Sequence, residues 1–442
     1  MRTGPLILWI FFTAHAQQWP SFRGPSASGV AFDARLPLRW NTATGENIRW
    51  KTSVPGLAHS SPIVAGDRVF LTTAVSSKEG VGFKKGLYGA GTASDDISPQ
   101  ELKVLCYSLR DGNLLWSRTA YSGPPKEKRH VKSTYASATP VTDGRIVAAL
   151  FGSHGLYAYT VDGKPLWSRD LGRMDVGAYD APDYEWGTAS SPIMYRDLVI
   201  VQADMQKGSF LIAVEKRTGK VVWRTERDEL PSWGTPTVFT GGNRDELVTN
   251  ASRFVRGYDP STGKELWRLG GSSKITAPTP VFGNGIIVVA SGRRPEAPIF
   301  AIKPGASGAI DGTSGKLAWK KNQRGPYMPT PLILGEYLYS LNNPGVFDCY
   351  RLATGEEIYR ERIPHAGSGF SSSPVAADGI IYIGSEDGTV SVIQAGPQFK
   401  LLTTNDMGEA IMATPAIARR TLLVRTERHL IAVGSAAATH ER

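Results

Sequence analysis

The fold is decided by the stretch at residues 191–223, which reads SPIMYRDLVIVQADMQKGSFLIAVEKRTGKVVW. Four short β-rich runs follow one another in it, at residues 193–194, 198–202, 210–214 and 221–223. β-branched and apolar residues dominate these runs, and turn residues separate them, which is typical of antiparallel strands joined by tight connections. The stretch therefore predicts a single sheet of four consecutive strands.

The same unit recurs along the chain. Each copy opens on serine or threonine followed by proline, at Ser61-Pro62, Thr139-Pro140, Ser191-Pro192, Thr235-Pro236, Thr279-Pro280, Thr330-Pro331, Ser373-Pro374 and Thr414-Pro415. Successive prolines are 78, 52, 44, 44, 51, 43 and 41 residues apart, close to the period of a propeller blade. Proline suits the first strand of a blade because that strand lines the channel and lacks an inner partner. The repeats predict an all-β, eight-bladed propeller with four-stranded blades.

A turn and a tryptophan end five of the units. The pattern is Asp111-Gly112…Trp116, Asp162-Gly163…Trp167, Thr218-Gly219…Trp223, Thr262-Gly263…Trp267 and Ser314-Gly315…Trp319, and it weakens to Thr354-Gly355…Tyr359. The glycine supplies the positive φ of a tight hairpin. A tryptophan that recurs in five units indicates packing between blades, because structural roles repeat and binding sites do not.

The last unit lacks its outer strand. It stops after residues 430–433 without a turn and tryptophan, and the missing strand stands before the first unit, at Glu46 to Thr52. We therefore expect an N-terminal strand to complete the last blade and close the ring, which leaves no free sheet edge. The predicted organisation is a signal peptide at 1–16, an N-terminal arm at 17–45 laid over one face, the propeller at 46–434 and a C-terminal tail at 435–442.

The first sixteen residues, MRTGPLILWIFFTAHA, favour export. Arg2 precedes an apolar run, and Ala14 and Ala16 stand where a signal peptidase requires small side chains. The run is too short to span a bilayer, and no cysteine follows it that could carry a lipid. The expected location is the periplasm or the extracellular medium, with no membrane span and a monomeric protein.

The formal net charge of the 442-residue chain is +10. Basic residues cluster at 84–85, 126–132 and 419–428, and a positive field attracts anionic glycans, lipids or acidic proteins. An exported protein rarely meets nucleic acid, so no nucleic-acid partner is expected. Cys106 and Cys349 are the only cysteines and lie far apart in sequence. They could pair in an oxidising compartment, but two buried small apolar residues are the favoured interpretation.

Three connections are longer than the repeat requires. They are residues 76–101, 121–136 and 172–187, and loops of this kind usually cover the mouth of a propeller and carry specificity.

The repeated Thr-Gly-Lys-x-x-Trp ending and the Ser/Thr-Pro opening resemble the repeat of pyrroloquinoline quinone (PQQ) binding β-propellers. Residues 19–25 (WPSFRGP) and 133–140 (STYASATP) are also similar to exported bacterial PQQ-like repeat proteins. The repeat is specific for the fold and weak for the activity. The resemblance spans quinoprotein alcohol dehydrogenases, which use PQQ and calcium, and the scaffold lipoprotein of outer-membrane β-barrel assembly. The adjacent-cysteine disulfide of the dehydrogenases and the lipid-bearing cysteine of the scaffold are both absent.

PQQ chemistry would require a carboxylate base, oxygen ligands for a cation, a cationic side chain and an aromatic platform. The candidate catalytic carboxylates are Asp180, Asp183 and Glu185, of which Asp180 and Asp183 are also the candidate metal ligands. The candidate cofactor-binding residues, all expected at one channel mouth, are Trp186, Trp233, His59, His130, Lys132, Tyr135 and Tyr327. The alternative for these residues is a solvated acidic loop with aromatics packed on the rim.

Three functions follow from this reasoning. The favoured one is an exported binding or scaffold module whose channel mouth and long loops contact a protein partner or small ligand. The second is a PQQ- and calcium-dependent oxidoreductase of alcohols or sugars that uses the loop from Asp180 to Trp186. The third is binding of an anionic cell-envelope glycan by the basic loop from Lys126 to Lys132.

Overall fold

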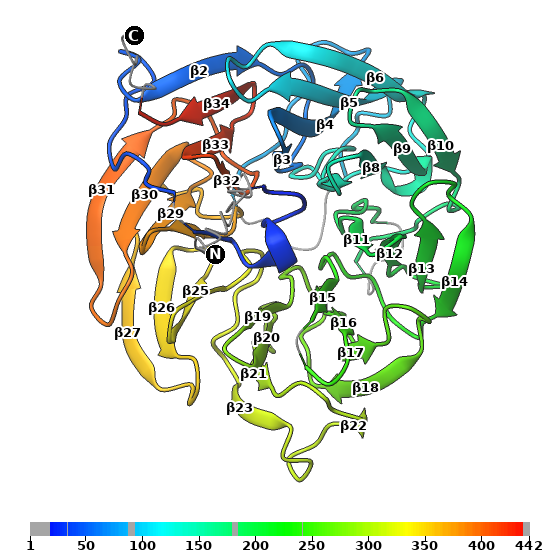
Figure 1. Cartoon of the computed structure of the whole chain (residues 1–442), viewed down its shortest axis with the longest axis vertical. Helices are drawn as coiled ribbons and strands as arrows, with labels where there is room; N and C mark the ends of the chain where they lie inside the picture. The colour runs from blue at the N-terminus through cyan, green and yellow to red at the C-terminus, as the bar shows by residue number, and fades with distance from the viewer. Residues whose placement is uncertain (1–17, 33, 87–92, 179–183, 241, 436–442) are drawn as a thin grey trace, which may run out of the picture.

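The protein is an eight-bladed β-propeller. A computed structural model describes residues 18–32, 34–86, 93–178, 184–240 and 242–435, and the predicted signal peptide and nearly all of the predicted C-terminal tail lie outside them. Eight antiparallel sheets surround a central axis, as Figure 1 shows. The predicted fold class is therefore confirmed.

The blades follow one another in chain order, and each runs from the channel outward. Blade 1 consists of β3 (Ile63–Ala65), β4 (Arg68–Ser76), β5 (Gln100–Ser108) and β6 (Leu114–Gly123). Blade 2 consists of β7 (Val141–Thr142), β8 (Ile146–Leu150), β9 (Leu156–Thr160) and β10 (Pro165–Arg169). Blade 3 consists of β11 (Ile193–Tyr195), β12 (Leu198–Ala203), β13 (Phe210–Glu215) and β14 (Val221–Glu226). Blade 4 consists of β15 (Thr237–Phe239), β16 (Glu246–Thr249), β17 (Phe254–Tyr258) and β18 (Glu265–Gly270).

The second half of the ring repeats this order. Blade 5 consists of β19 (Val281–Gly283), β20 (Ile286–Ala290), β21 (Ile299–Ile302) and β23 (Leu317–Lys321). Blade 6 consists of β24 (Leu332–Leu334), β25 (Tyr337–Leu341), β26 (Val346–Arg351) and β27 (Glu357–Arg362). Blade 7 consists of β28 (Val375–Ala377), β29 (Ile380–Gly384), β30 (Thr389–Gln394) and β31 (Lys400–Asp406).

Blade 8 joins the two ends of the chain. Its inner strands β32 (Ala416–Ala418), β33 (Thr421–Arg425) and β34 (His429–Val433) come from the C-terminal part, and its outer strand β2 (Ile48–Ser53) comes from the N-terminal part. β2 pairs antiparallel with β34, and Figure 1 shows the two strands side by side. The predicted closure of the ring by an N-terminal strand is confirmed.

The repeated tryptophans form an outer belt between blades. Four of the five tryptophans, Trp116, Trp167, Trp223 and Trp319, stack over the turn glycine of the next blade. The contact is so close that a Cβ on Gly219 would lie 2.7 Å from the Trp167 ring. The indole Nε1–H of each of the four donates to a backbone carbonyl of the next blade, as Trp167 does to Lys216 at 2.9 Å and Trp223 to Pro260 at 3.2 Å. The expected role of these residues in blade-to-blade packing is confirmed.

The belt is interrupted between blades 4 and 5. The indole of Trp267 donates to Glu246 Oε2 within its own blade at 2.7 Å, and the turn glycine Gly315 has no atom within 4 Å of a built Cβ. A short extra strand, β22 (Gly308–Ala309), pairs in parallel with the outer strand β18 at this place. The insertion that carries β22 thus accompanies the separation of Trp267 from Gly315, a tryptophan and a turn glycine of the kind that stack at other places in the belt.

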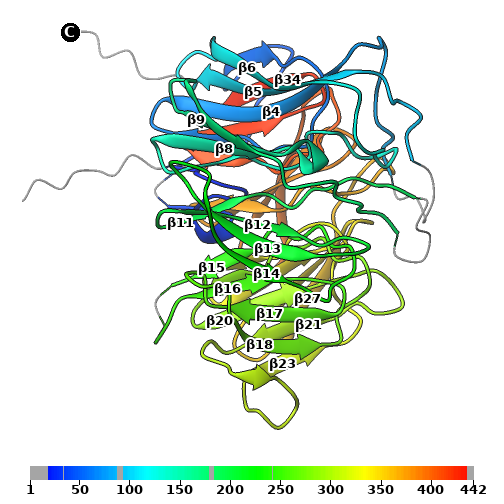
Figure 2. The ribbon, with the colours of Figure 1, turned by 90° about the vertical axis from the view of Figure 1, so that its right-hand side faces the viewer.

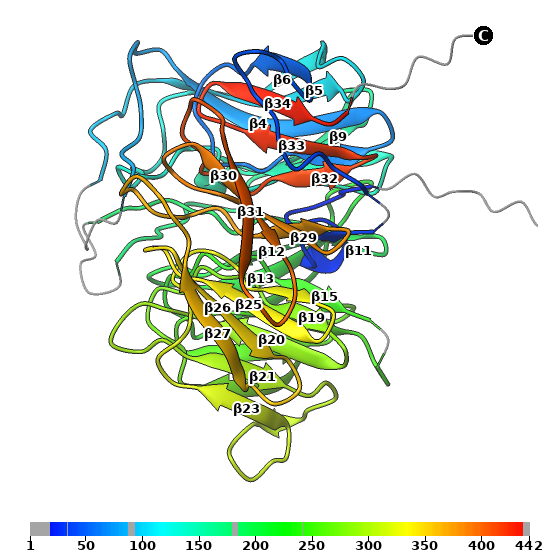
Figure 3. The ribbon, with the colours of Figure 1, turned by 90° about the vertical axis from the view of Figure 1, so that its left-hand side faces the viewer.

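The N-terminal arm enters the channel. Trp19 is fully buried and forms a bridge with Val64 of blade 1. The short 3-10 helix η1 (Pro25–Ala27) follows, and β1 (Val30–Ala31) pairs in parallel with the inner strand β28. Blade 7 therefore has an inner partner where a free inner edge was expected. Figures 2 and 3 show this arm on one side of the ring and the long loops on the opposite side.

Both cysteines are buried and free. Cys106 lies in β5 and Cys349 in β26, in different blades, and burial raises the pKa of each thiol to about 12. Each thiol is thus a small apolar core group. The described part of the chain also has no helix with the length and apolarity that crossing a membrane requires.

Candidate ligand site in the central channel

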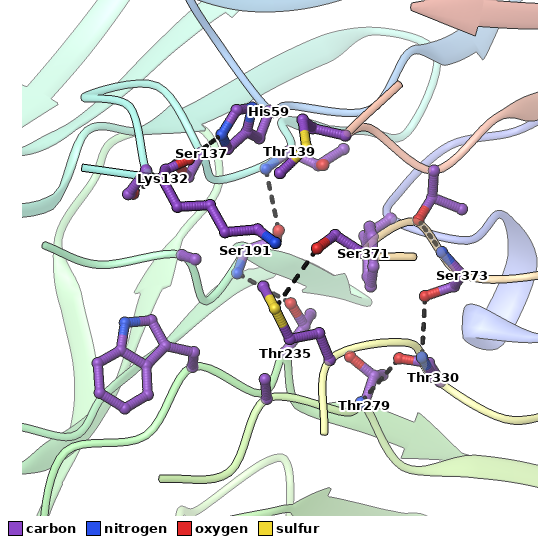
Figure 4. A pocket seen from close by; sticks show the side chains of 18 of the residues that line it. His59, Lys132, Ser137, Thr139, Ser191, Thr235, Thr279, Thr330, Ser371 and Ser373 are labelled. Carbon is purple, nitrogen blue, oxygen red and sulfur yellow. Dashed lines mark hydrogen bonds between the residues drawn. The ribbon is translucent and has the colours of Figure 1, made fainter. Parts of the chain in front are cut away.

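A cavity of about 230 Å³ occupies the channel on the side of the long loops. Phe22 of the N-terminal arm lines it, and so do the opening residues of all eight repeats. Gly86, His130 and Lys132 of two long loops also line it, which places the cavity on the loop side of the channel. Figure 4 shows these lining side chains from close by.

A ring of hydroxyl groups surrounds the cavity. The backbone N–H of one opening residue donates to the side-chain hydroxyl of the next, for example from Ser61 to Thr139 at 2.9 Å and from Ser191 to Thr235 at 3.0 Å. The same bond joins Thr139 to Ser191, Thr279 to Thr330, Thr330 to Ser373 and Ser373 to Thr414. The Ser61 and Thr279 hydroxyls have no hydrogen-bond partner although they are buried. The ring is therefore a repeated structural device with two gaps.

An aromatic wall stands on one side of the cavity. The rings of Trp186 and Trp233 lie 5.8 Å apart at 39°, and the His130 ring meets Trp186 edge-on at 5.3 Å. The Trp233 indole donates to Gly187 O at 2.8 Å, whereas the buried Trp186 indole N–H has no partner. Tyr327 also lines the cavity, and burial raises its pKa. Such a wall suits the face of a planar ligand.

Two neutral histidines line the cavity near the loops. His59 Nε2 lies 2.6 Å from Lys132 O, so Nε2 carries the proton and Nδ1 is a buried acceptor without a partner. His130 Nδ1 accepts the Lys132 backbone N–H at 3.1 Å, which leaves the His130 proton on Nε2. Burial lowers the pKa of each imidazole to about 4. Both rings are therefore uncharged at neutral pH.

Lys132 crosses the mouth of the cavity to reach Glu386 of blade 7. Its Nζ donates to Glu386 Oε1 at 2.5 Å and to Gly86 O at 2.7 Å, and burial lowers its pKa. Glu386 also accepts from the Gly86 N–H and from the Ser371 hydroxyl. In Figure 4 the Lys132 side chain extends over the cavity toward Ser371. The pair thereby ties two long loops to blade 7.

Two buried arginines stand close to the cavity without a carboxylate partner. Arg23 of the arm donates to Pro331 O at 3.0 Å and Pro374 O at 2.8 Å, next to the lining residues Thr330 and Ser373. Arg425 donates to Thr72 O at 2.7 Å, and its Nε and Nη2 have no partner.

Burial lowers the pKa of Arg23 to about 9 and that of Arg425 to about 10, so both stay charged at neutral pH. Sequence reasoning missed Arg23, Arg425 and Glu386. For Arg23, the similarity of the WPSFRGP segment to other proteins was a usable sequence signal, and Arg425 and Glu386 had none.

The structure brings six of the predicted site residues to the cavity: His59, His130, Lys132, Trp186, Trp233 and Tyr327. Tyr135 does not line it, because its hydroxyl donates to Asp96 O at 3.1 Å in a neighbouring pocket. Glu185 does not line it either. Its carboxylate pairs with Arg173 and accepts the Lys128 N–H at 2.6 Å. Asp180 and Asp183 lie outside the described residues.

The described residues offer no calcium site. No group of three His, Cys, Asp or Glu side chains in the described ranges could hold a metal ion. Glu386 is bonded to the lining residue Lys132, and lysine, serine and backbone donors already occupy its oxygens.

The basic loop from Lys126 to Lys132 uses most of its charge internally. Lys132 pairs with Glu386, and the buried Arg129 donates to Ser133 O and Gly82 O. Only Lys126 and Lys128 remain exposed, and Lys126 lies 3.9 Å from Asp170. Two exposed lysines provide little positive charge for binding a polyanionic glycan.

Comparison with known proteins agrees with this architecture. The profile of the family described as outer membrane protein assembly factor BamB matches residues 100–247 and 251–433. A curated protein, tetrathionate hydrolase of Acidithiobacillus ferrooxidans, is 23% identical over 389 residues, which cover 81% of this chain and 70% of that protein.

Two solved structures are similar in fold. BamB from Moraxella catarrhalis has 13% identity and a TM-score of 0.53, over 84% of this chain and 98% of that one. Quinohemoprotein alcohol dehydrogenase from Comamonas testosteroni has 12% identity and a TM-score of 0.62, over 96% and 82%. At these identities the likeness shows the fold alone, and the two structures carry different functions on it.

Proposed function

Because the chain belongs to the family of the outer membrane protein assembly factor BamB, a PQQ-like repeat family, we propose that it is a binding module. Its ligand is a small planar molecule held in the cavity on the loop side of the channel. The observation that carries this proposal is the cavity itself, which is lined by Phe22, Trp186 and Trp233. A concave apolar wall with a few convergent polar groups is typical of small-molecule sites.

The experiment compares the wild-type protein with an Ala277→Phe variant. Ala277 lines the cavity, so a phenyl ring there fills the space where a ligand would lie. Both proteins are titrated with PQQ, with and without calcium, with tetrathionate and with a set of planar aromatic acids and amides. We expect saturable binding of at least one planar probe to the wild type, lost in Ala277→Phe at an unchanged unfolding temperature. Absence of binding, or equal binding by both proteins, contradicts the proposal.

The same titration separates the enzymatic alternatives. Calcium-dependent binding of PQQ with dye-linked alcohol oxidation would favour the oxidoreductase and give Asp180 and Asp183 a role. Because the described residues offer no metal site, we propose no quinone-dependent step. Tetrathionate is included because one relative is named for its hydrolysis. Turnover of tetrathionate would show that the protein is an enzyme rather than a binding module.

The scaffold form of the proposal uses the loop face instead of the cavity. Ile97 and Tyr184 are exposed apolar side chains, 61% and 40% accessible, on two of the long loops. A protein partner that binds there should bind Ala277→Phe as well as wild type, because the substitution leaves the loop surface unchanged. Export to the periplasm or medium is part of the proposal. It is tested by sequencing the N-terminus of the mature protein, which we expect at Gln17.

A further inference from the structure

We propose that the ligand of the channel cavity is an anion, a planar organic acid whose charged oxygens face Lys132. This inference rests on the proposed function and narrows it to one chemical class. It comes from the balance of charge around the cavity, which the aromatic wall alone does not reveal.

Buried cations outnumber carboxylates around the cavity. Lys132 lines the cavity, whereas Arg23 and Arg425 lie behind it and donate to carbonyls of residues next to the lining. Among the described residues, Glu386 is the only carboxylate that pairs with any of the three. Arg23 and Arg425 donate to backbone carbonyls alone, and Arg425 Nε and Nη2 have no partner. A buried charge normally has an opposite charge beside it, because burial without a counter-ion is costly. An anion in the cavity would supply part of the missing negative charge.

The same cations act on the two histidines that line the cavity. His59 feels three charged groups, Arg425, Lys132 and Arg129, and all three are cations that lower its pKa further. For His130 the charged group is again Lys132. Charges are weakly screened in a poorly solvated site, so these cations also act on a ligand in the cavity.

Three of the lining residues supply hydrogen-bond donors, and His59 Nδ1 is an unpartnered acceptor among them. Lys132 Nζ, the His130 Nε2–H and the unpartnered Trp186 Nε1–H all belong to lining residues. Trp186 is 7% exposed, so its N–H is a buried donor that a ligand could satisfy. Three donors suit the oxygens of a carboxylate or sulfonate, which accept hydrogen bonds and donate none.

The test uses two probes of equal shape, 2-naphthoate and 2-naphthamide, in calorimetric titrations of the full-length protein. They present the same ring system to Trp186 and Trp233 and differ in charge. We expect 2-naphthoate to bind about tenfold more tightly or better, the equivalent of about 1.4 kcal/mol. Equal or tighter binding of 2-naphthamide would overturn the anion inference and leave the proposed binding function standing. Binding of neither probe would overturn both.

Three variants locate the charge. Glu386→Gln removes the one opposing carboxylate, so the preference for 2-naphthoate should increase several-fold. Lys132→Gln should reduce the preference to about one. Lys128→Gln is the matched control, because Lys128 is an exposed lysine of the same loop, and it should change nothing. If Lys132→Gln does not fold, the Glu386→Gln result still decides, since an unchanged or smaller preference there contradicts the inference.

Discussion

The outer belt of the propeller and the lining of its channel are built from the same repeats but use their polar atoms differently. In the belt, the indole N–H of Trp167 or Trp223 reaches a carbonyl of the next blade, and a glycine fills the space beneath the ring. In the channel, the Ser61 and Thr279 hydroxyls, His59 Nδ1 and the Trp186 indole N–H are buried without partners.

The comparison shows where the chain departs from its own repeat. Buried polar atoms without partners are costly, so they persist where another requirement outweighs stability. The belt satisfies its groups because its only task is to hold adjacent blades together. The channel collects unpaired polar atoms and cations, which a ligand can satisfy. Substitutions in the belt should therefore change stability, and substitutions in the channel should act more weakly or through pH.

The largest expected effect is in the belt. Trp223 is 8% exposed and packs with Ile200, Leu211 and Leu247 across two blades. Trp223→Ala should lower the free energy of unfolding by about 3–5 kcal/mol, because it opens a cavity and breaks the bond to Pro260 O. Urea unfolding measures it. Val222→Ala on the same strand is the control, since Val222 is 54% exposed and should change stability by less than about 0.5 kcal/mol.

A pair of turn glycines tests the belt contact itself. Gly219 and Gly315 both have positive φ, 71° and 63°, so alanine is strained at either position by about 1 kcal/mol. At Gly219 the new methyl group would also meet the Trp167 ring at 2.7 Å, whereas at Gly315 it would meet nothing. Gly219→Ala should therefore cost about 1–3 kcal/mol more than Gly315→Ala in thermal or urea unfolding. Equal costs would show that the belt contact does not constrain the turn.

Most of the fold could be predicted from the sequence because it repeats. The Ser/Thr-Pro openings mark each inner strand, and the missing last strand pointed to the segment that became β2. Repeats also placed Trp186 and Trp233 correctly, since each stands shortly before an opening and such positions meet at the channel mouth. The arm inside the channel and the insertion at β22 were not predictable in this way, because neither belongs to the repeat.

The charges of the site could not be predicted because their partners are far apart. Lys132 and Glu386 are separated by 254 residues, and no motif connects them. Arg425 ends β33 like any strand residue, and only the three-dimensional structure shows that no carboxylate accompanies it. Tyr135 was predicted at the channel mouth from its position in the repeat, and the structure places it elsewhere. It precedes an opening closely, but its side chain turns to Asp96 instead of the channel.

In the channel, the strongest expected effect depends on pH. His59 has its pKa lowered to about 4, against about 6.5 in the unfolded chain, mainly by burial. The unfolded state therefore binds more protons, and stability should be lost as the pH falls from about 6.5 to about 4. For His59 the loss at pH 5 is about 2 kcal/mol. Urea unfolding at pH 7 and pH 5 should show a smaller difference for His59→Gln, which keeps a donor for Lys132 O. Identical differences in the two proteins would refute this assignment.

The smallest effect distinguishes two members of the hydroxyl ring. Thr235 Oγ1 accepts the Ser191 N–H at 3.0 Å, whereas Thr279 Oγ1 is buried without a partner. Valine replaces the hydroxyl by a methyl group of similar shape. Thr235→Val should cost about 1–2 kcal/mol, because it leaves a buried N–H unsatisfied. Thr279→Val should be neutral or slightly stabilising, because it removes an unpaired oxygen. If both variants lose the same stability, the gap at Thr279 is satisfied in solution and the channel resembles the belt more than we infer.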